Sequence, residues 1–190
     1  MKPFRLFAIS SFLPILFWAC SPGPKIYTQN INDLRLDISM AVLPFANFSG
    51  TEDAGRQVYN AFLVELLNRH SFKILEPGEI DRVLREERVR ITDRIDFATI
   101  EILKNRLNVD FLLLGSVNEY DYQKSQNREI PRLGFTVRLL DINTGQIVWA
   151  ANHNRKGDDS ELIFGWGIIS SLSDLTAQSA HQVVNKIKVD

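Results

Sequence analysis

The chain has 190 residues, of which 45% are hydrophobic, with 22 basic against 23 acidic side chains and a formal net charge of −1. A nucleic-acid-binding protein needs a basic field to attract phosphates, so this charge balance argues against a nucleic-acid partner. One cysteine cannot form a disulfide within the chain, so the fold must be held by packing alone.

The first residues have the pattern of an export signal. Lys2 and Arg5 precede residues 6–19, which carry no charge and end in the small residue Ala19. A positive segment, an apolar segment and a small residue in that order are typical of a secretory signal peptide. The apolar run is shorter than the about 20 residues that a membrane-spanning helix needs, and Pro14 interrupts it.

The single cysteine, Cys20, directly follows Ala19. An export signal that ends at a cysteine resembles the bacterial lipoprotein signal, in which the thiol is lipidated after cleavage. Phe17 and Trp18 differ from the residues usual at those positions in such signals. A plain cleaved signal and an uncleaved anchor therefore remain as alternatives to lipidation with palmitate at Cys20.

These observations predict three segments. Residues 1–19 form a lipoprotein signal peptide, residues 20–36 comprise the lipidated cysteine and a flexible tether, and residues 37–190 form one folded domain. The tether contains Ser21-Pro22-Gly23-Pro24, a sequence that favours extended or turning backbone.

The folded part alternates strand-like and helix-like patterns. The predicted elements, in chain order, are a strand over residues 38–45, a helix with an apolar stripe over 59–67, a strand over 72–75, a helix from 77, a helix marked by 100–107, strands over 110–117, 133–142 and 146–154, and a helix over 170–188. Together they predict an α/β (α+β) class, with a mixed central β-sheet flanked by helices in a single domain.

Three local features refine this prediction. Ser49 and Glu52 have the spacing of a capping box for the first helix. The strand over residues 110–117 is apolar without alternation, which favours a central strand covered on both faces. Asn143-Thr144-Gly145 between two strands predicts a hairpin in which Gly145 adopts a left-handed conformation.

The sequence contains no pattern that indicates catalysis. His70 and His153 are interpreted as satisfied structural histidines, and no Cys, His, Asp or Glu cluster has metal-ligand spacing. We therefore expect no enzyme activity, no catalytic residue, no metal and no cofactor. The balanced charges of residues 79–96 favour a solvated helix face over an anion-binding patch. The apolar "LIFGWGII" (162–169) is interpreted as a packing segment or a partner-docking loop.

Several stretches together resemble one family. "MAVLPFANFSG", "FKILEPGEIDRVLREE", "NVDFLLLGSVNEY" and "RLLDINTGQIVW" resemble the CsgG-like family of bacterial lipoproteins. This family includes the curli secretion channel lipoprotein CsgG and, more distantly, the penicillin-binding protein activator LpoB. The resemblance implies an α/β domain that is lipid-anchored at the outer membrane, faces the periplasm and works by binding envelope proteins without catalysis.

Three functions follow as hypotheses. The first is a non-catalytic, lipid-anchored periplasmic adaptor or assembly factor, such as an activator of a peptidoglycan synthase. The alternatives are a subunit of a CsgG-type outer-membrane secretion apparatus for curli-like export and a structural envelope lipoprotein. Where the curli channel carries two long membrane hairpins, this chain has only residues 123–132 and 155–170, so we expect membrane contact only through the lipid on Cys20. A homo-oligomer is left open, and the sequence does not identify the client protein.

Overall fold

The structure is a computed structural model that describes residues 23–28, 38–69, 71–90, 94–125, 128–161 and 166–187. The described residues form a seven-stranded sheet with the order β1-β7-β6-β5-β2-β4, and β3 pairs separately with β5. The strands are β1 (Lys25–Thr28), β2 (Ile38–Val42), β3 (Ala46–Asn47), β4 (Phe72–Ile74), β5 (Phe111–Ser125), β6 (Arg128–Asp141) and β7 (Ile147–Lys156). The helices are α1 (Ala54–Asn68), α2 (Pro77–Glu86), α3 (Phe97–Leu107) and α4 (Leu172–Val184).

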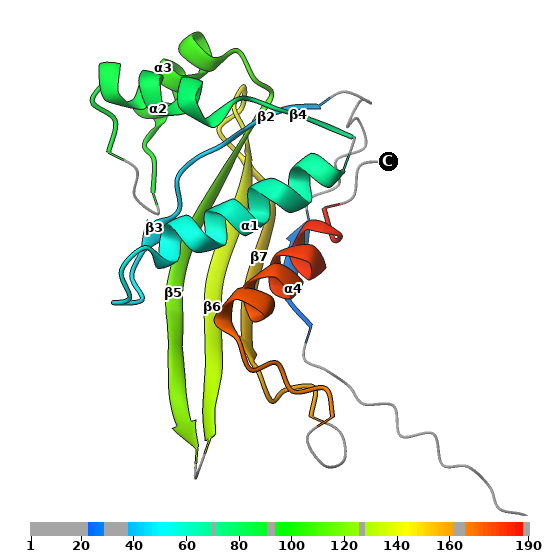
Figure 1. Ribbon diagram of the computed structural model, residues 1–190. Helices are drawn as coiled ribbons and strands as arrows, with labels where there is room; N and C mark the ends of the chain where they lie inside the picture. Colours follow the sequence, from blue (N-terminus) through cyan, green and yellow to red (C-terminus); the bar gives the residue numbers. More distant parts are fainter. Residues whose placement is uncertain are drawn as a thin grey trace, which may run out of the picture.

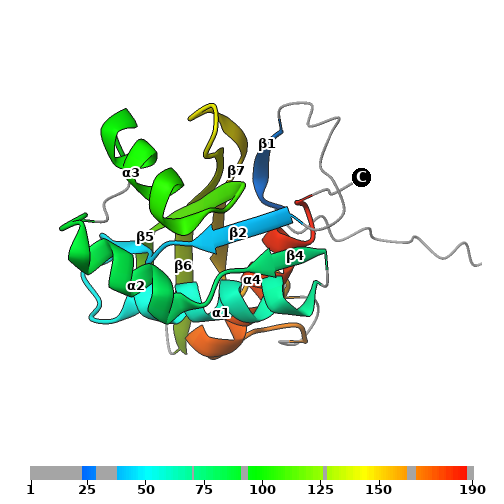
Figure 2. The same cartoon turned by 90° about the horizontal axis from the view of Figure 1, so that it is seen from above.

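The sheet is mixed, as the sequence predicted. β2 runs parallel to both β4 and β5, whereas β5, β6, β7 and β1 are successively antiparallel. α1 and α4 lie side by side across one face, and α2 and α3 lie at the end of the sheet near β2 and β4 (Figures 1 and 2). The predicted fold class of a mixed sheet flanked by helices is confirmed.

Two hydrophobic cores lie on opposite faces of the sheet. In β5, Phe111, Leu113 and Val117 belong to the core under α1 and α4. Leu112 and Leu114 point the other way, into the core under α2 and α3. Successive side chains of a strand face opposite sides of the sheet, so this alternation confirms that the first half of β5 is a central strand covered on both faces.

Side-chain caps define the beginnings of three helices. α2 begins with Pro77 at its first turn, and the Glu76 side chain accepts a hydrogen bond from the Glu79 amide (3.1 Å). Asp96 and Ser171 accept equivalent bonds at the beginnings of α3 and α4, from Thr99 N (2.8 Å) and Asp174 N (3.0 Å). Each cap satisfies an amide that has no partner within the helix.

The capping box predicted for α1 is wrong. The N-cap residue is Asp53, which has a positive φ of 61° and makes no side-chain cap. Ser49 instead donates from Oγ to Asn47 Oδ1 (2.7 Å) and accepts from Thr51 N (3.2 Å). Ser49 thus stabilises the turn before the helix. Short polar side chains can form hydrogen bonds either in such turns or as helix caps, and the spacing in the sequence does not distinguish the two.

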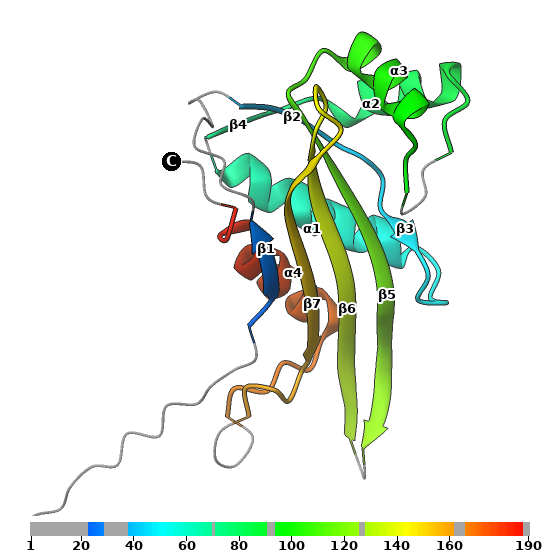
Figure 3. The same ribbon diagram turned by 180° about the vertical axis from the view of Figure 1, so that it is seen from behind.

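The β5–β6 hairpin is much longer than the strands predicted for it. Residues 123–125 and 128–132 continue the two strands, with Gln123 opposite Ile130 and Ser125 opposite Arg128. The end of the hairpin extends past α1 and α4 (Figure 1). Figure 3 shows that no described helix covers the opposite face of β5, β6 and β7 along this length.

β1 was not predicted, and it lies within the range 20–36 that was predicted as a tether. It pairs antiparallel with β7, with Lys25 opposite Asn152 and Thr28 opposite Trp149. All four of its residues are exposed. Within the described ranges, no helix is both long and apolar enough to cross a membrane.

Candidate docking surfaces

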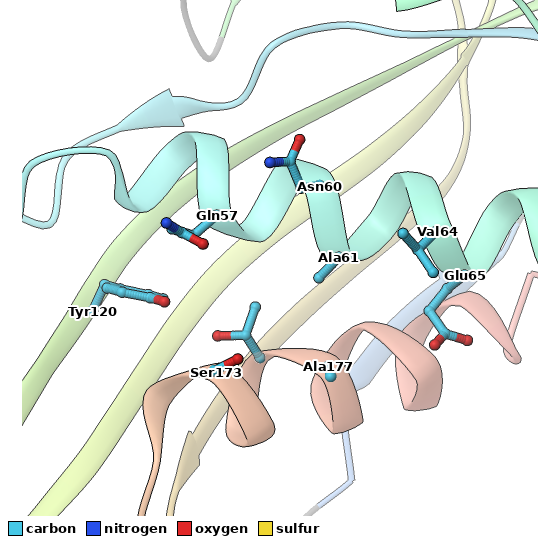
Figure 4. A pocket seen from close by; sticks show the side chains of 9 residues that line it. Gln57, Asn60, Ala61, Val64, Glu65, Tyr120, Ser173 and Ala177 are labelled. Atoms are coloured by element: carbon cyan, nitrogen blue, oxygen red, sulfur yellow. The ribbon is translucent and has the colours of Figure 1, made fainter.

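A groove runs along the outer surface where α1 meets α4. Its first part is a hollow of about 280 Å³ (Figure 4). The hollow is lined by Gln57, Asn60, Ala61, Val64 and Glu65 of α1, by Tyr120 of β5, and by Ser173, Thr176 and Ala177 of α4.

The helical period explains which side chains line this groove. Val58, Phe62 and Leu66 form the buried stripe of α1 on the sheet. A second stripe, which includes Gln57, Ala61 and Glu65 at i, i+4 and i+8, faces outward toward α4. The small side chains of Ala61 and Ala177 leave the groove between the helices unfilled (Figure 4).

The groove continues toward the ends of both helices. A second hollow of about 400 Å³ shares Glu65 and Ala177 with the first and is lined further by Gln178, His181 and Gln182. His181 Nδ1 lies 2.8 Å from Glu65 Oε2 and so joins the two helices, and its Nε2 lies 2.8 Å from Asn185 Nδ2.

The groove has the chemistry of a binding surface. Gln57, Asn60, Gln178 and Gln182 supply amide groups, each of which can donate and accept hydrogen bonds. Val64 is apolar, and 56% of its surface is exposed. Amides beside exposed apolar surface can hold the main chain and side chains of another polypeptide. Within the described part of the chain, no group of three or more His, Cys, Asp and Glu side chains could hold a metal ion.

A second polar cluster lies beneath α4 and is buried. Trp149, His153 and Arg155 of β7 alternate toward the helix-covered face, and their exposed fractions are 1%, 1% and 6%. Most polar atoms of this cluster have no hydrogen-bond partner among the described residues. These atoms are Trp149 Nε1, both ring nitrogens of His153, and Arg155 Nε and Nη1. Only Arg155 Nη2 has one, Ser160 Oγ at 3.3 Å.

Burial determines the charge state of His153. Desolvation lowers the pKa of His153 to about 4, and the nearby Arg155 guanidinium contributes to the lowering. The ring lies 5.3 Å from that of Phe135, so it packs as an apolar group. The interpretation of His153 as a satisfied histidine is wrong, because neither ring nitrogen has a hydrogen-bond partner among the described residues. His70 lies outside the described residues.

The loop after β7 exposes a tryptophan. Ile169 N donates to Gly157 O (2.8 Å), and the Ile169 side chain is buried. Gly167 has a φ of 91°, and a Cβ there would lie 2.3 Å from Ser160 O, so the loop closes tightly at this point. Trp166, the neighbouring residue, is 77% exposed. The "LIFGWGII" segment is therefore divided: Ile169 packs in the core and Trp166 faces outward, while residues 162–165 lie outside the described ranges.

Of the charged run predicted as a solvated helix face over residues 79–96, the part on α2 is such a face, and the helix ends at Glu86. Arg82 pairs with Glu79 and with Glu86, and Arg106 of α3 pairs with Glu86 and Glu87. These side chains are 28–48% exposed, and the Arg82 guanidinium is the main cause that lowers the pKa of Glu79 and of Glu86. The predicted lipid-attachment residue, Cys20, lies outside the described residues.

Comparison with known sequences gives one family. The model of the family described as "Peptidoglycan-synthase activator LpoB" matches residues 40–154, from β2 to near the end of β7. No curated protein sequence matches the chain.

Comparison with solved structures gives the same kind of fold. The PelC dodecamer from Paraburkholderia phytofirmans is 21% identical, with a TM-score of 0.56 over 85% of this chain and 93% of PelC. Lipoprotein GNA1162 from Neisseria meningitidis is 18% identical, with a TM-score of 0.56 over 78% of this chain and 99% of that protein. The hypothetical protein CT253 from Chlamydia trachomatis is 14% identical, with a TM-score of 0.52 over 80% and 95%. At these identities the similarity establishes the fold alone.

Proposed function

The chain belongs to the LpoB family, and we propose that it is a lipid-anchored periplasmic adaptor that binds and activates a peptidoglycan synthase at the outer membrane. The observation that carries this proposal is the family match over residues 40–154, which includes all or most of each strand from β2 to β7 and the helices α1, α2 and α3. Membership in a family of activators confirms the prediction of a non-catalytic protein that works by binding.

The anchor in this proposal is Cys20, the single cysteine of the chain. It follows a signal of the lipoprotein kind, and the family match supports a location in the periplasm. Cells that express the Cys20→Ser variant are expected to incorporate no labelled palmitate into the protein and to leave it unprocessed at Ala19. Normal palmitate labelling of the serine variant would show that the lipid is attached elsewhere.

We place the synthase on the groove between α1 and α4. The groove is open along both helices, carries amides on both sides and includes exposed Val64. The carboxylate of Glu65, which lines the groove, is paired with His181 of the same groove. These features suit an extended, uncharged segment of the synthase, whose main chain would exchange hydrogen bonds with Gln57, Asn60, Gln178 and Gln182.

A synthase assay with purified components tests this placement. Val64→Glu puts a charge in the groove at an exposed position, so the fold is expected to survive while stimulation of glycan-strand synthesis is lost. Phe97→Glu on α3 is the matched control, because Phe97 is also an exposed apolar helix residue (66%) but does not line the groove. Equal stimulation by Val64→Glu and the wild type would exclude the groove, and failure of the wild type to bind any peptidoglycan synthase would exclude the function.

The alternatives predict different measurements. A subunit of a CsgG-type secretion apparatus would give discrete conductance steps in planar bilayers, and a structural envelope lipoprotein would leave synthase activity unchanged. PelC is a dodecamer, but at 21% identity it supports the fold alone, so self-association of this chain stays a prediction that light scattering of the purified protein can test.

A further inference from the structure

β1 fixes where the chain enters the folded domain. Lys25 pairs with Asn152 and Thr28 with Trp149, so β1 runs opposite to β7. β7 ends at Lys156, next to the loop that carries Trp166. The N-terminal end of β1 therefore points toward this loop and the end of the β5–β6 hairpin (Figures 1 and 3).

The chain between the anchor and β1 is short. Five residue steps separate Cys20 from Lys25, and an extended chain covers at most about 3.3–3.6 Å per residue, which gives a reach of about 18 Å. Lys25 is level with Asn152 on β7, four residues before Lys156. At about 3.3 Å per residue, the end of β7 lies about 13 Å beyond Lys25. A lipid on Cys20 can thus reach little farther than the Trp166 loop.

The hairpin reaches farther than the anchor. One row of paired residues crosses the strands β1, β7, β6 and β5. It consists of Lys25, Asn152, Thr136 and Ser116. Eight residue steps along β6 separate Thr136 from Arg128 at the end of the hairpin, a length of about 26 Å. If the strands stood upright on the membrane, the end of the hairpin would have to penetrate about 8 Å past the anchor.

Penetration to that depth conflicts with the residues at the end of the hairpin. Lys124, Arg128 and Glu129 are exposed there, and charged side chains are costly in hydrocarbon. An upright orientation is therefore unfavourable, whereas a tilted domain can keep these charges in water with the Trp166 loop at the membrane. Tryptophan is the side chain that favours the interface between headgroups and hydrocarbon.

We propose that this end of the domain, formed by the Trp166 loop and the end of the β5–β6 hairpin, rests on a phospholipid surface, with the Trp166 ring inserted among the headgroups. The proposal rests on the anchor at Cys20 put forward above. It adds an orientation: the short link to β1 holds the domain against the membrane, and the α1–α4 groove on its flank stays accessible to a periplasmic enzyme.

The charges at this end do not require an acidic membrane. Lys124, Arg128 and Lys156 are balanced by Glu129, Asp158, Asp159 and Glu161, and Arg128 lies 3.6 Å from Glu161. Contact should therefore depend on the tryptophan and the anchor, and we expect it on uncharged phosphatidylcholine vesicles and at high salt.

Tryptophan fluorescence gives a direct test, because the chain from Cys20 onward contains only Trp149, which is 1% exposed, and Trp166. The chain from Cys20 onward is coupled through its single thiol to a maleimide phospholipid in phosphatidylcholine vesicles. Coupling supplies the anchor chemically, so the result does not depend on lipidation in cells or on synthase binding. We expect a blue shift and loss of most Trp166 emission when the vesicle lipids are brominated, and no such quenching in coupled Trp166→Phe.

A second variant tests the role of the short link. Inserting 20 glycine and serine residues between Cys20 and Lys25 gives a flexible linker with an average span of about 25 Å, which frees the domain from the surface. Quenching is expected to fall markedly while near-ultraviolet circular dichroism shows an intact fold. Unquenched Trp166 in vesicle-coupled wild type would overturn the proposal, and so would quenching that the long linker leaves unchanged.

Discussion

Gly145 has the left-handed backbone that its position in the hairpin turn predicted, with a φ of 69°. Its amide donates to Asp141 O (2.8 Å), and a Cβ would meet Ile100 and Phe97 only at ordinary contact distances of 3.7 and 3.8 Å. A substitution there is therefore strained by the backbone and not by crowding. We expect Gly145→Val to lower the free energy of unfolding by about 1 kcal/mol or more.

Urea denaturation of two variants measures this cost. Gly145→Asn is the matched control, because asparagine tolerates the left-handed region better than valine, and it is expected to lose less stability. Equal losses for the two variants would mean that side-chain size, not backbone conformation, limits the position.

His153 should make stability depend on pH. Its folded-state pKa of about 4 lies below the ordinary value of 6.5, so the unfolded chain binds the proton more tightly. The contribution of neutral His153 to the free energy of unfolding is therefore complete above pH 6.5, and it is lost as the pH falls toward 4. Each pH unit within this window changes the free energy of unfolding by about 1.4 kcal/mol at most, so about 2 kcal/mol is lost by pH 5.

The His153→Phe variant removes this dependence. At pH 7 it should be at least as stable as the wild type, since neither ring nitrogen of His153 has a described partner to lose. Denaturation at pH 7 and pH 5 should show a smaller loss in the variant than in the wild type. Identical losses would place the titration of His153 outside this window.

Between elements, one side chain joins the end of α1 to the end of α4. Arg69 Nη1 donates to Val184 O and to Ile187 O, the latter at 2.9 Å. Val184 is the last residue of α4, and its carbonyl also accepts from Ile187 N (3.0 Å), whereas Ile187 lies just beyond the helix. Arg69→Met keeps much of the side-chain length but loses both bonds, so we expect a loss of about 2 kcal/mol in the free energy of unfolding.

Arg56→Met at the beginning of α1 is the control for this prediction. Arg56 pairs with Asp53 in water, with exposed fractions of 65% and 52%, and an exposed pair of this kind contributes little. Thermal melts of both variants provide the comparison. A similar melting temperature for both would show that Arg69 does not hold the two helices together.

The elements that sequence patterns predicted are those with a buried face. The stripe of α1 and the unbroken apolar start of β5 each carry a local signature of burial, and Pro77 marks the first turn of α2. The far half of the β5–β6 hairpin was missed because its side chains are exposed and polar. There, backbone hydrogen bonding to the partner strand decides the structure, and it leaves no period in the side chains.

At the scale of the whole molecule, β1 decides how far the domain stands from the anchor proposed at Cys20. The pairing of β1 with β7 predicts that the β1 amides that bond to β7 exchange hydrogen more slowly than those of an unstructured segment. Hydrogen exchange followed by mass spectrometry of the N-terminal peptides measures this protection. Exchange at the rate of a free chain would show that these residues belong to a flexible tether, as the sequence predicted, and not to the sheet.

The sequence by itself determined the signal-like start, the fold class, the family resemblance and the turn at Gly145, because each depends on residues close together in the chain. Tertiary structure alone decided the groove, the buried group on β7 and the short link to the sheet. Glu65 and His181 meet across 116 residues, and Lys25 meets Asn152 across a similar separation. Such contacts depend on how helices and strands pack, and a side chain that is buried or paired by a distant segment carries no local pattern that distinguishes it from an exposed one.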